Sequence, residues 1–238
     1  MKRSEINAAI KWAEGLCKQH HITLPFFSNL PADKAEFRKP ERINLFKTML
    51  GWDVSDFSSG DFETCGAVLF TVRNGSVLES GVGTPYAEKY IFLKDGKEQE
   101  IPLHYHNCKT EDIINRAGGV FCCQLAVCGA DGKPDFTKPV RVLRDGEYYD
   151  AAPGEIIEIT TGNSITLEPG VFHRFFAKTG YGDLLIGEVS KINDDNTDNV
   201  FAVTRERFCG IDEDEPPYRL LCNEYPPAQG ETDIGENA

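Results

Sequence analysis

The sequence predicts an all-β sandwich or barrel preceded by helices, and three observations lead to this prediction. From about Thr64 onward, short segments rich in Val, Ile, Phe and Thr follow one another at regular intervals. Turns such as Asn74-Gly75 and Asp95-Gly96 separate these segments, and such dipeptides supply the positive φ that tight hairpins require. Clear helical spacing is confined to the first part of the chain, so the pattern favours hairpins over βαβ units.

Two helices are expected before the strands. In the first, Ser4 is a candidate N-cap, and apolar residues recur at helical spacing through Ile10 to Cys17. The second is expected over residues 41–50, because Pro40 precedes it and Gly51 follows it. We therefore expect residues 1–60 to form a helical segment that packs on the barrel.

The expected strands can be followed in order through the rest of the chain. They read GAVLFTV, KYIFL, VFCCQLAV, VRVL, EIIEIT, SITLE and LLIGEVS. We expect them to form one barrel domain over residues 61–225, with a less regular C-terminal extension after Ile192. The acidic run at residues 212–215 is expected to be a solvated face, and residues 226–238 a disordered tail.

The composition excludes some classes of partner. The chain has 238 residues, with 38 acidic and 25 basic ones and a net charge of −13. We expect no nucleic-acid partner and no anionic membrane surface, because both require clustered Lys and Arg. No apolar run approaches the ~20 residues that span a bilayer, and the N-terminus lacks a signal-peptide pattern. The 8 cysteines lack paired-CxxC spacing, which favours reduced thiols in a cytoplasmic protein.

The histidines carry the chemical signal. His104 and His106 stand at positions i and i+2, so on a strand both side chains point to one face. Glu111 can join them if the chain bends between Asn107 and Lys109. With His173, these residues form a set of three imidazoles and one carboxylate, which suits a divalent first-row metal such as Mn²⁺, Fe²⁺ or Co²⁺ better than a closed structural zinc site.

An HxH pair is also common among surface or hydrogen-bonded histidines, so the pair alone is a weak signal. His173, which follows its own Pro169-Gly170 turn, strengthens the metal interpretation. The pattern His104-x-His106-x4-Glu111-x6-Gly118 resembles the first motif of the cupins. The second stretch, Pro169-Gly170-x2-His173 preceded by Gly162, resembles their second motif, although Pro-Gly replaces Pro-x-Gly and Ala177 stands where Asn is common. This resemblance implies a double-stranded β-helix, or jelly-roll barrel, with a metal in its mouth.

A more specific resemblance extends from about Lys89 to Tyr225. The runs YAEKYIF, HYHNCKTEDIINRAGG, LEPGVFHRFF, GEVSKINDDNTDN and RERFCGIDEDEP resemble bacterial D-lyxose isomerases. This resemblance implies interconversion of D-lyxose and D-xylulose, often also of D-mannose and D-fructose, by a cytoplasmic homodimer. It implies Mn²⁺ as the metal, with Co²⁺ or Fe²⁺ as alternatives, and the ligands His104, His106, Glu111 and His173.

The reaction suggests further residues. Lys109, two residues before Glu111, is expected either to stabilise an enediolate as a cation or to act as an acid/base with a lowered pKa. Glu188 lies in the apolar strand LLIGEVS, which favours a general base or a ligand of a sugar hydroxyl over an outward-facing glutamate. Lys89 and Glu206 are candidate sugar-binding residues. Three others are weaker candidates: Arg174, Asp198 and Arg207.

Two mechanisms and two other functions stay open at this stage. Isomerisation can proceed by proton abstraction through a cis-enediol or by hydride shift, and in either case the metal would bind O1 and O2 of the sugar. The same ligands suit a non-haem iron dioxygenase, and a cupin can also bind sugar without catalysis. The polar residues expected around the metal favour a polyol substrate.

Overall fold

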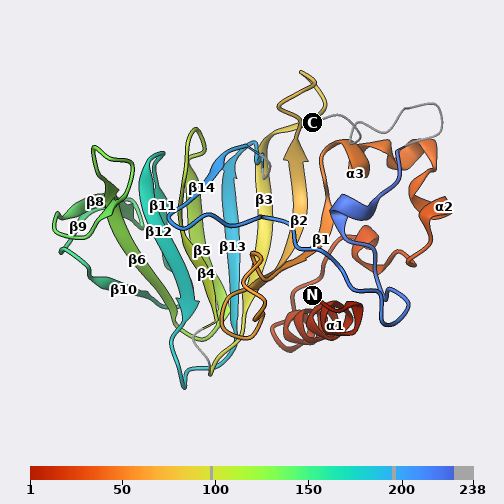
Figure 1. Ribbon diagram of the computed structural model, residues 1–238, viewed down its shortest axis with the longest axis horizontal. Coiled ribbons are helices and arrows are strands. Elements are labelled where there is room, and N and C mark those ends of the chain that lie inside the picture. Colours follow the sequence, from red (N-terminus) through yellow and green to blue (C-terminus); the bar gives the residue numbers. More distant parts are fainter. Residues whose placement is uncertain (97–98, 195–196, 228–238) are drawn as a thin grey trace.

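The computed structural model describes residues 1–96, 99–194 and 197–227 as two curled antiparallel sheets with helices at one end (Figure 1). The expected disordered tail lies, from residue 228 onward, outside the described residues. The prediction of an all-β fold with N-terminal helices is confirmed. No helix within the described ranges is long and apolar enough to cross a membrane.

Each sheet is built from strands that are distant in the sequence. The larger has eight strands in the order β1 (Gly51–Ser55), β2 (Ala67–Gly75), β3 (Gly83–Leu93), β13 (Leu184–Lys191), β5 (Glu111–Gly118), β11 (Ser164–Leu167), β8 (Val140–Arg144) and β9 (Glu147–Ala151). The smaller sheet has six strands. Five of them follow the order β10 (Ile156–Ile159), β6 (Phe121–Cys128), β12 (Val171–Ala177), β4 (Glu100–His106) and β14 (Asn199–Phe201), and the sixth, β7 (Pro134–Asp135), pairs with β6.

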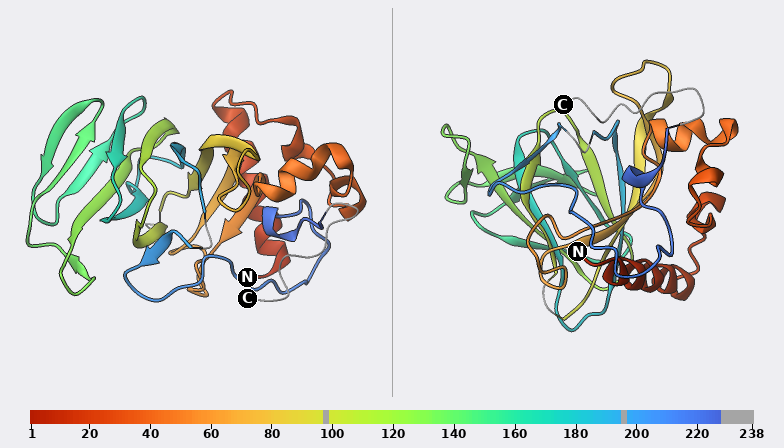
Figure 2. Two further views of the ribbon diagram at one scale, coloured as in Figure 1. Left: turned by 90° about the horizontal axis from the view of Figure 1, so that it is seen from above. Right: turned by 45° about the vertical axis from the view of Figure 1, so that its right-hand side comes forward.

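The helices cover one end of the larger sheet (Figure 2). They are α1 (Arg3–Gln19), α2 (Lys34–Phe37) and α3 (Ile43–Lys47), with short 3-10 helices at Phe26–Asn29, Pro40–Arg42 and Cys222–Glu224. The apolar face of α1, which includes Ile6 and Ile10, is buried in a cluster with Trp52 and Phe70 of β1 and β2. Burial of this outer face of the sheet ties the helical segment to the barrel.

A second apolar cluster fills the space between the two sheets. Alternation along β2 explains both clusters, because Val68 and Phe70 join the cluster under α1 whereas Ala67 and Leu69 join the one inside the barrel. All four are buried, so both faces of this first part of the strand are covered. Members of the inner cluster such as Leu69 and Ile91 also line the cavity described below.

The N-terminal segment differs in detail from the prediction. Helix α1 has Lys2 as its N-cap, and Ser4 lies inside the helix, where its hydroxyl donates to Asp214 at 2.6 Å. The helix expected over residues 41–50 is shorter, because Met49 and Gly51 adopt positive φ values of 52° and 116°. At Gly51 a Cβ would lie 2.1 Å from the Tyr225 hydroxyl, so only glycine fits there. Strand β1 follows, within the segment expected to be helical.

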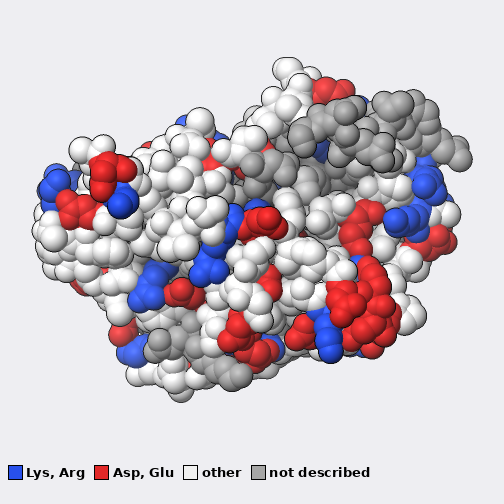
Figure 3. Space-filling view, viewed as in Figure 1, with Lys and Arg blue, Asp and Glu red and all other residues white. Residues whose placement is uncertain are grey.

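The acidic run at residues 212–215 does more than face solvent. These side chains are exposed, but they also bind the start of α1, where Figure 3 shows acidic residues gathered. Arg3, which is fully buried, pairs with Glu213 at 2.6 Å and also with Glu224. The side chain of Asn7 donates to Glu215 at 2.6 Å. The C-terminal extension is therefore held to the first helix.

Candidate active site

The candidate site lies between the two sheets, and each sheet supplies a different kind of side chain. Strands β4 and β12 of the smaller sheet supply His104, His106 and His173, with His104 directly opposite His173 in the register. The larger sheet supplies Glu111 on β5 and Glu188 on β13. Period-two alternation sends all of these side chains to the barrel interior, where each is buried.

The three imidazoles converge through their Nε2 atoms. The Nε2 atoms of His104 and His173 lie 3.1 Å apart, and the ligand atoms of all three histidines lie within 4.8 Å of one another. The Nδ1 atoms of His104 and His173 face the backbone carbonyls of Pro102 and Val171 at 2.8 and 2.9 Å. An N–H on Nδ1 that donates to a carbonyl leaves the Nε2 lone pair directed into the site.

Burial keeps the rings of His104 and His173 neutral. Desolvation lowers the pKa of His173 to about 4, and desolvation together with the other histidines holds the pKa of His104 well below its usual value. Neutral imidazole is the form that binds a metal.

Glu111 completes this cluster. Its carboxylate oxygens lie 3.4 Å from His106 Nε2 and 3.3 Å from His173 Nε2. Burial opposes ionisation, but the charge of Lys109 and the contact with His106 hold the pKa of Glu111 well below its usual value. Its Oε1 atom is buried and makes no hydrogen bond within the described part of the chain. Lone pairs of nitrogen and carboxylate oxygen thus face one point, which is the arrangement that a divalent cation fits.

Lys109 is enclosed by acceptors. Its Nζ lies 2.9 Å from Glu111 Oε2, 2.9 Å from Glu188 Oε1 and 3.2 Å from Asn193 Oδ1. Burial by itself would lower the pKa of Lys109, but the two carboxylates outweigh burial and raise it above the ordinary value. Of the two roles expected for Lys109, the one that requires a lowered pKa is therefore wrong, because the sequence did not reveal the second carboxylate, Glu188, which lies 79 residues away. The ammonium form is the one present.

Glu188 is a buried and ionised carboxylate. Burial would raise its pKa, but Lys109 and Lys89 lower it below the ordinary value. Lys89 stands opposite Glu188 in the register of β3 and β13 and is itself buried. Ser190 also donates its hydroxyl to Glu188 at 3.1 Å. A carboxylate held ionised next to the histidine cluster can accept a proton from a bound molecule.

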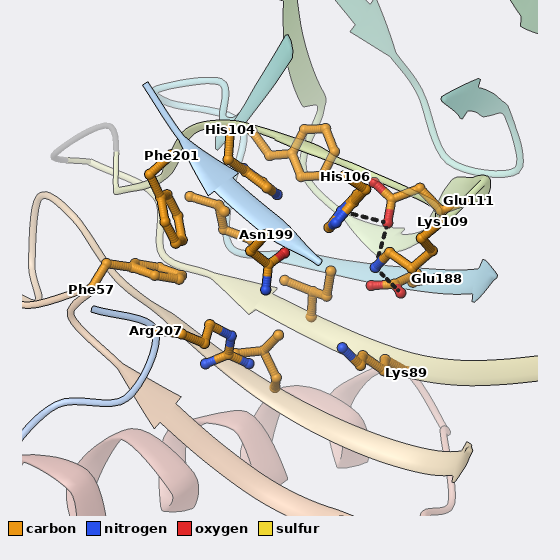
Figure 4. Close-up of a pocket in the computed structure, with 14 residues that line it drawn as sticks. Phe57, Lys89, His104, His106, Lys109, Glu111, Glu188, Asn199, Phe201 and Arg207 are labelled. Atoms are coloured by element: carbon orange, nitrogen blue, oxygen red, sulfur yellow. Dashed lines mark hydrogen bonds and ion pairs between the residues drawn. The ribbon is translucent and has the colours of Figure 1, made fainter. Parts of the chain in front are cut away.

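His104, His106, Lys109, Glu111 and Glu188 line one cavity (Figure 4). Lys89 faces it from the side opposite His104 and His106. Phe57, Asn199 and Phe201 were not expected in the site, and Arg207 was only a weak candidate. All four line the cavity, together with Leu69, Lys89, Ile91, Ile101, His104, His106, Lys109, Glu111, Phe175 and Glu188. No motif marks these four, because their segments reach the cavity only through the fold.

Three candidate residues lie elsewhere. Glu206 is exposed and outside the cavity lining, with its carboxylate 3.5 Å from the hydroxyl of Ser58; its neighbour Arg207 lines the cavity instead. Arg174 follows His173 on β12, so it points the other way and pairs with Glu100 at 2.8 Å. Asp198 lies behind the site, with Oδ2 3.5 Å from His106 Nδ1.

The sequence of this chain matches a known protein family over residues 1–225. The sequence model of the D-lyxose isomerase family matches residues 1–225. The chain belongs to this family. A protein of Escherichia coli O157:H7 named D-lyxose/D-mannose isomerase is 39% identical over 227 residues, covering 94% of this chain and 98% of that protein. A protein of the same name from Serratia proteamaculans is 37% identical over the same length. The resemblance to D-lyxose isomerases is confirmed, and this family member is a sugar isomerase.

Solved structures confirm the barrel type. The L-ribose isomerase of Geodermatophilus obscurus superposes with a TM-score of 0.54 at 14% identity, covering 89% of this chain and 98% of that one. The Cellulomonas parahominis L-ribose isomerase with L-ribose gives a TM-score of 0.52 with the same identity and coverage. At this identity the likeness concerns the fold alone. It agrees with the predicted cupin double-stranded β-helix preceded by helices.

Proposed function

We propose that this isomerase interconverts D-lyxose with D-xylulose, and D-mannose with D-fructose. One observation carries the proposal: an ionised carboxylate–lysine pair, Glu188 and Lys109, faces the same cavity as His104, His106 and Glu111, which form one cluster with His173. An aldose–ketose isomerase requires these two elements, one to bind the sugar oxygens and one to move a proton. The names of the two bacterial relatives support the choice of sugars.

The cluster fits a divalent metal, and we propose His104, His106, Glu111 and His173 as its ligands. Three imidazoles and one carboxylate suit Mn²⁺, which we propose as the metal, with Co²⁺ and Fe²⁺ as alternatives of the same ligand preference. When bound, such an ion supplies Lewis-acid polarisation of the sugar oxygens at C1 and C2.

Glu188 is the proposed base. Its ionised carboxylate removes the proton from C2 of the aldose, and the C–H electrons form a C1=C2 double bond. The electrons of the C1 carbonyl move to O1 as a proton passes from O2 to O1, which leaves an enediolate with one negative charge on O2 while Glu188 holds the proton. Return of the proton from Glu188 to C1 then gives the ketose, with the carbonyl at C2. Lys109 and Lys89 keep this carboxylate ionised, so it is in the form that can accept a proton.

Lys109 and Lys89 are the proposed electrostatic partners of this step. Lys109 donates to Glu188 at 2.9 Å and keeps the carboxylate in place. When Glu188 takes up a proton, the Lys109 ammonium stays charged beside the oxygens on which negative charge develops. Lys89 faces Glu188 from β3 and lines the cavity, which suits contact with a sugar hydroxyl.

A hydride shift between C2 and C1 is the alternative route, and solvent isotope separates the two. Under the proton route, turnover of D-lyxose in D₂O places deuterium at C1 of D-xylulose, because the proton on Glu188 exchanges with solvent. A product free of deuterium after many turnovers would instead establish the hydride shift.

The function itself is tested by activity of the metal-stripped protein with D-lyxose and D-mannose, with and without added Mn²⁺. We expect D-xylulose and D-fructose only in the presence of metal. Full activity without metal would refute the metal assignment. Sugar binding without turnover would favour a non-catalytic cupin, and oxygen consumption on another substrate would favour a dioxygenase.

We also propose that the protein is cytoplasmic and forms a homodimer. The buried Cys17, Cys65 and Cys123 form no disulfide bond, as expected in a reducing compartment. The dimer rests on the family resemblance. Light scattering of the purified protein measures its mass in solution directly. A mass equal to that of a single chain would refute the homodimer.

A further inference from the structure

Arg207 lines the cavity at a distance from the proposed proton-transfer residues. It belongs to the segment that follows β14, and its side chain is only 10% exposed. In Figure 4, Arg207 and Phe57 lie at one end of the cavity, whereas Lys109, Glu111 and Glu188 lie at the other. A sugar whose first two carbons are near Glu188 therefore extends toward Arg207.

The fold holds this guanidinium in place from several directions. Arg207 Nη2 pairs with Asp53 Oδ2 at 2.6 Å, and the Asp53 side chain is 5% exposed. The hydroxyl of Ser55 donates to the Arg207 carbonyl at 2.7 Å, which fastens the segment to β1. The guanidinium also lies 5.9 and 5.1 Å from the ring centroids of Phe57 and Phe208. An arginine fixed in this way loses little conformational entropy when it binds a ligand.

The surroundings of Arg207 suit the remote part of a sugar. A guanidinium presents five N–H donors in a plane, and hydroxyl oxygens are acceptors. The nearby walls include the rings of Phe57 and Phe201, which can pack on the C–H groups of a sugar, and the amide of Asn199. The Asp53 pair offsets the arginine charge, so the site can bind a neutral polyol without requiring an anion.

We propose that Arg207, positioned by Asp53, binds the hydroxyl groups of the sugar that are remote from the reacting carbons. This inference rests on the proposed sugar isomerisation. Arg207 then determines how tightly the substrate is held, while Glu188 and Lys109 carry the chemical step. Its loss raises KM more than it lowers kcat, because the interaction is the same in the bound substrate and in the transition state.

The test compares three variants with the wild type as metal-loaded enzymes. Arg207→Met removes the donors, Arg207→Lys keeps a charge next to Asp53, and the double variant Asp53→Asn/Arg207→Gln removes both charges without leaving a buried unpaired carboxylate. Arg205→Met is the matched control, since Arg205 lies in the same segment but outside the cavity lining. The measurements are KM and kcat for D-lyxose and D-mannose, the bound metal and the melting temperature.

We expect a rise in KM of about tenfold or more in all three variants, with kcat within a few-fold of wild type. The amount of bound metal in these variants equals that of the wild type, and the control variant Arg205→Met retains the wild-type KM. An unchanged KM in the folded variants overturns the inference, as does a fall in kcat at constant KM. Failure of the proposed function can be distinguished from failure of this inference, because in that case the wild-type enzyme itself turns over neither sugar. That result would also overturn the inference.

Discussion

His104 and His173 are 69 residues apart in the sequence, and yet their Nε2 atoms lie 3.1 Å apart. Two neutral imidazoles that approach through these atoms have lone pairs facing each other, because each Nδ1 is turned to a backbone carbonyl. Such an approach is unfavourable unless a proton or a cation lies between them. Burial lowers the pKa of both rings, so a proton is disfavoured and a metal ion is the natural occupant.

Metal binding should therefore stabilise the fold. At a free Mn²⁺ concentration of 100 times Kd, binding adds about 2.7 kcal/mol to the free energy of unfolding. For a chain of this length we expect a rise in melting temperature of roughly 5–10 °C over the chelator-treated protein. The measurement is a thermal melt of stripped protein titrated with MnCl₂.

The His173→Ala variant should lose this metal-induced rise, because one of the converging nitrogens is gone. His21→Ala is the matched control, since His21 is exposed in the loop after α1 and should leave the rise intact. Equal metal-induced stabilisation of the His173→Ala and wild-type proteins would contradict the ligand assignment.

Removing the proposed base should stop catalysis without removing the metal. Glu188→Gln keeps the size of the side chain and its position on β13, but an amide cannot accept the C2 proton. We expect kcat to fall by about 10²–10⁴-fold, with bound Mn²⁺ unchanged by elemental analysis. Glu158→Gln is the control, because Glu158 pairs with Lys178 on the surface at 2.7 Å. Wild-type kcat in the Glu188→Gln variant would remove Glu188 from the mechanism.

Local pattern was sufficient to predict the imidazole cluster. Period-two alternation places His104 and His106 on one face, and the expected bend before Glu111 is present, because β4 ends at His106 and β5 begins at Glu111. The strands rich in branched residues were also visible, since their alternation and turns are encoded within each hairpin. Strand β1 was missed, because the alternation of Trp52 and Val54 with Asp53 and Ser55 covers only five residues and lies within the segment expected to be helical.

The far end of the cavity could not be predicted in the same way. Arg207 reaches the cavity because Ser55, 152 residues earlier, holds its backbone and Asp53 holds its guanidinium. Such contacts depend on the three-dimensional path of the chain and leave no periodic trace in the sequence. The charge of Lys109 was ambiguous for the same reason, since Glu188 is 79 residues away.

Asp198 should act on the metal through His106. Its Oδ2 lies 3.5 Å from His106 Nδ1, while its Oδ1 accepts from the backbone N–H of Cys108 at 2.7 Å. A carboxylate behind a ligating imidazole orients the ring and increases its basicity. Asp198→Asn keeps an oxygen for Cys108 but loses the charge, so we expect the Kd for Mn²⁺ to rise by about 10–100-fold.

A metal titration of that variant followed by turnover at saturating Mn²⁺ separates positioning from catalysis. We expect kcat to return to within a few-fold of wild type once the site is filled. Asp150→Asn, which alters an exposed pair with Arg141 at 2.7 Å, should leave the Kd unchanged. An unaltered Kd in the Asp198→Asn variant would exclude this role.

The contact between Arg3 and the C-terminal extension should contribute to stability. Arg3 is fully buried, whereas its partners Glu213 and Glu224 have side chains 56% and 19% exposed. Arg3→Met leaves Glu224 without its buried cation, and we expect a loss of about 3 kcal/mol, at the lower end for broken buried pairs because Glu213 is solvated. This corresponds to a fall in melting temperature of roughly 6–12 °C. The control variant Arg141→Met breaks an exposed pair with Asp150 and should change the melting temperature by at most about 1–2 °C.

The same contact gives this stabilisation a defined pH dependence. The hydrogen bond from Arg3 lowers the pKa of Glu213 below its ordinary value of 4.5. The stabilisation from this pair is therefore fully present above pH 4.5 and is lost as the pH falls through the lowered pKa. We expect the difference in melting temperature between wild type and Arg3→Met to be constant from pH 5 to 8 and to narrow below about pH 4. A difference that stayed constant down to pH 3 would show that Arg3 stabilises the fold through packing and not through its charge.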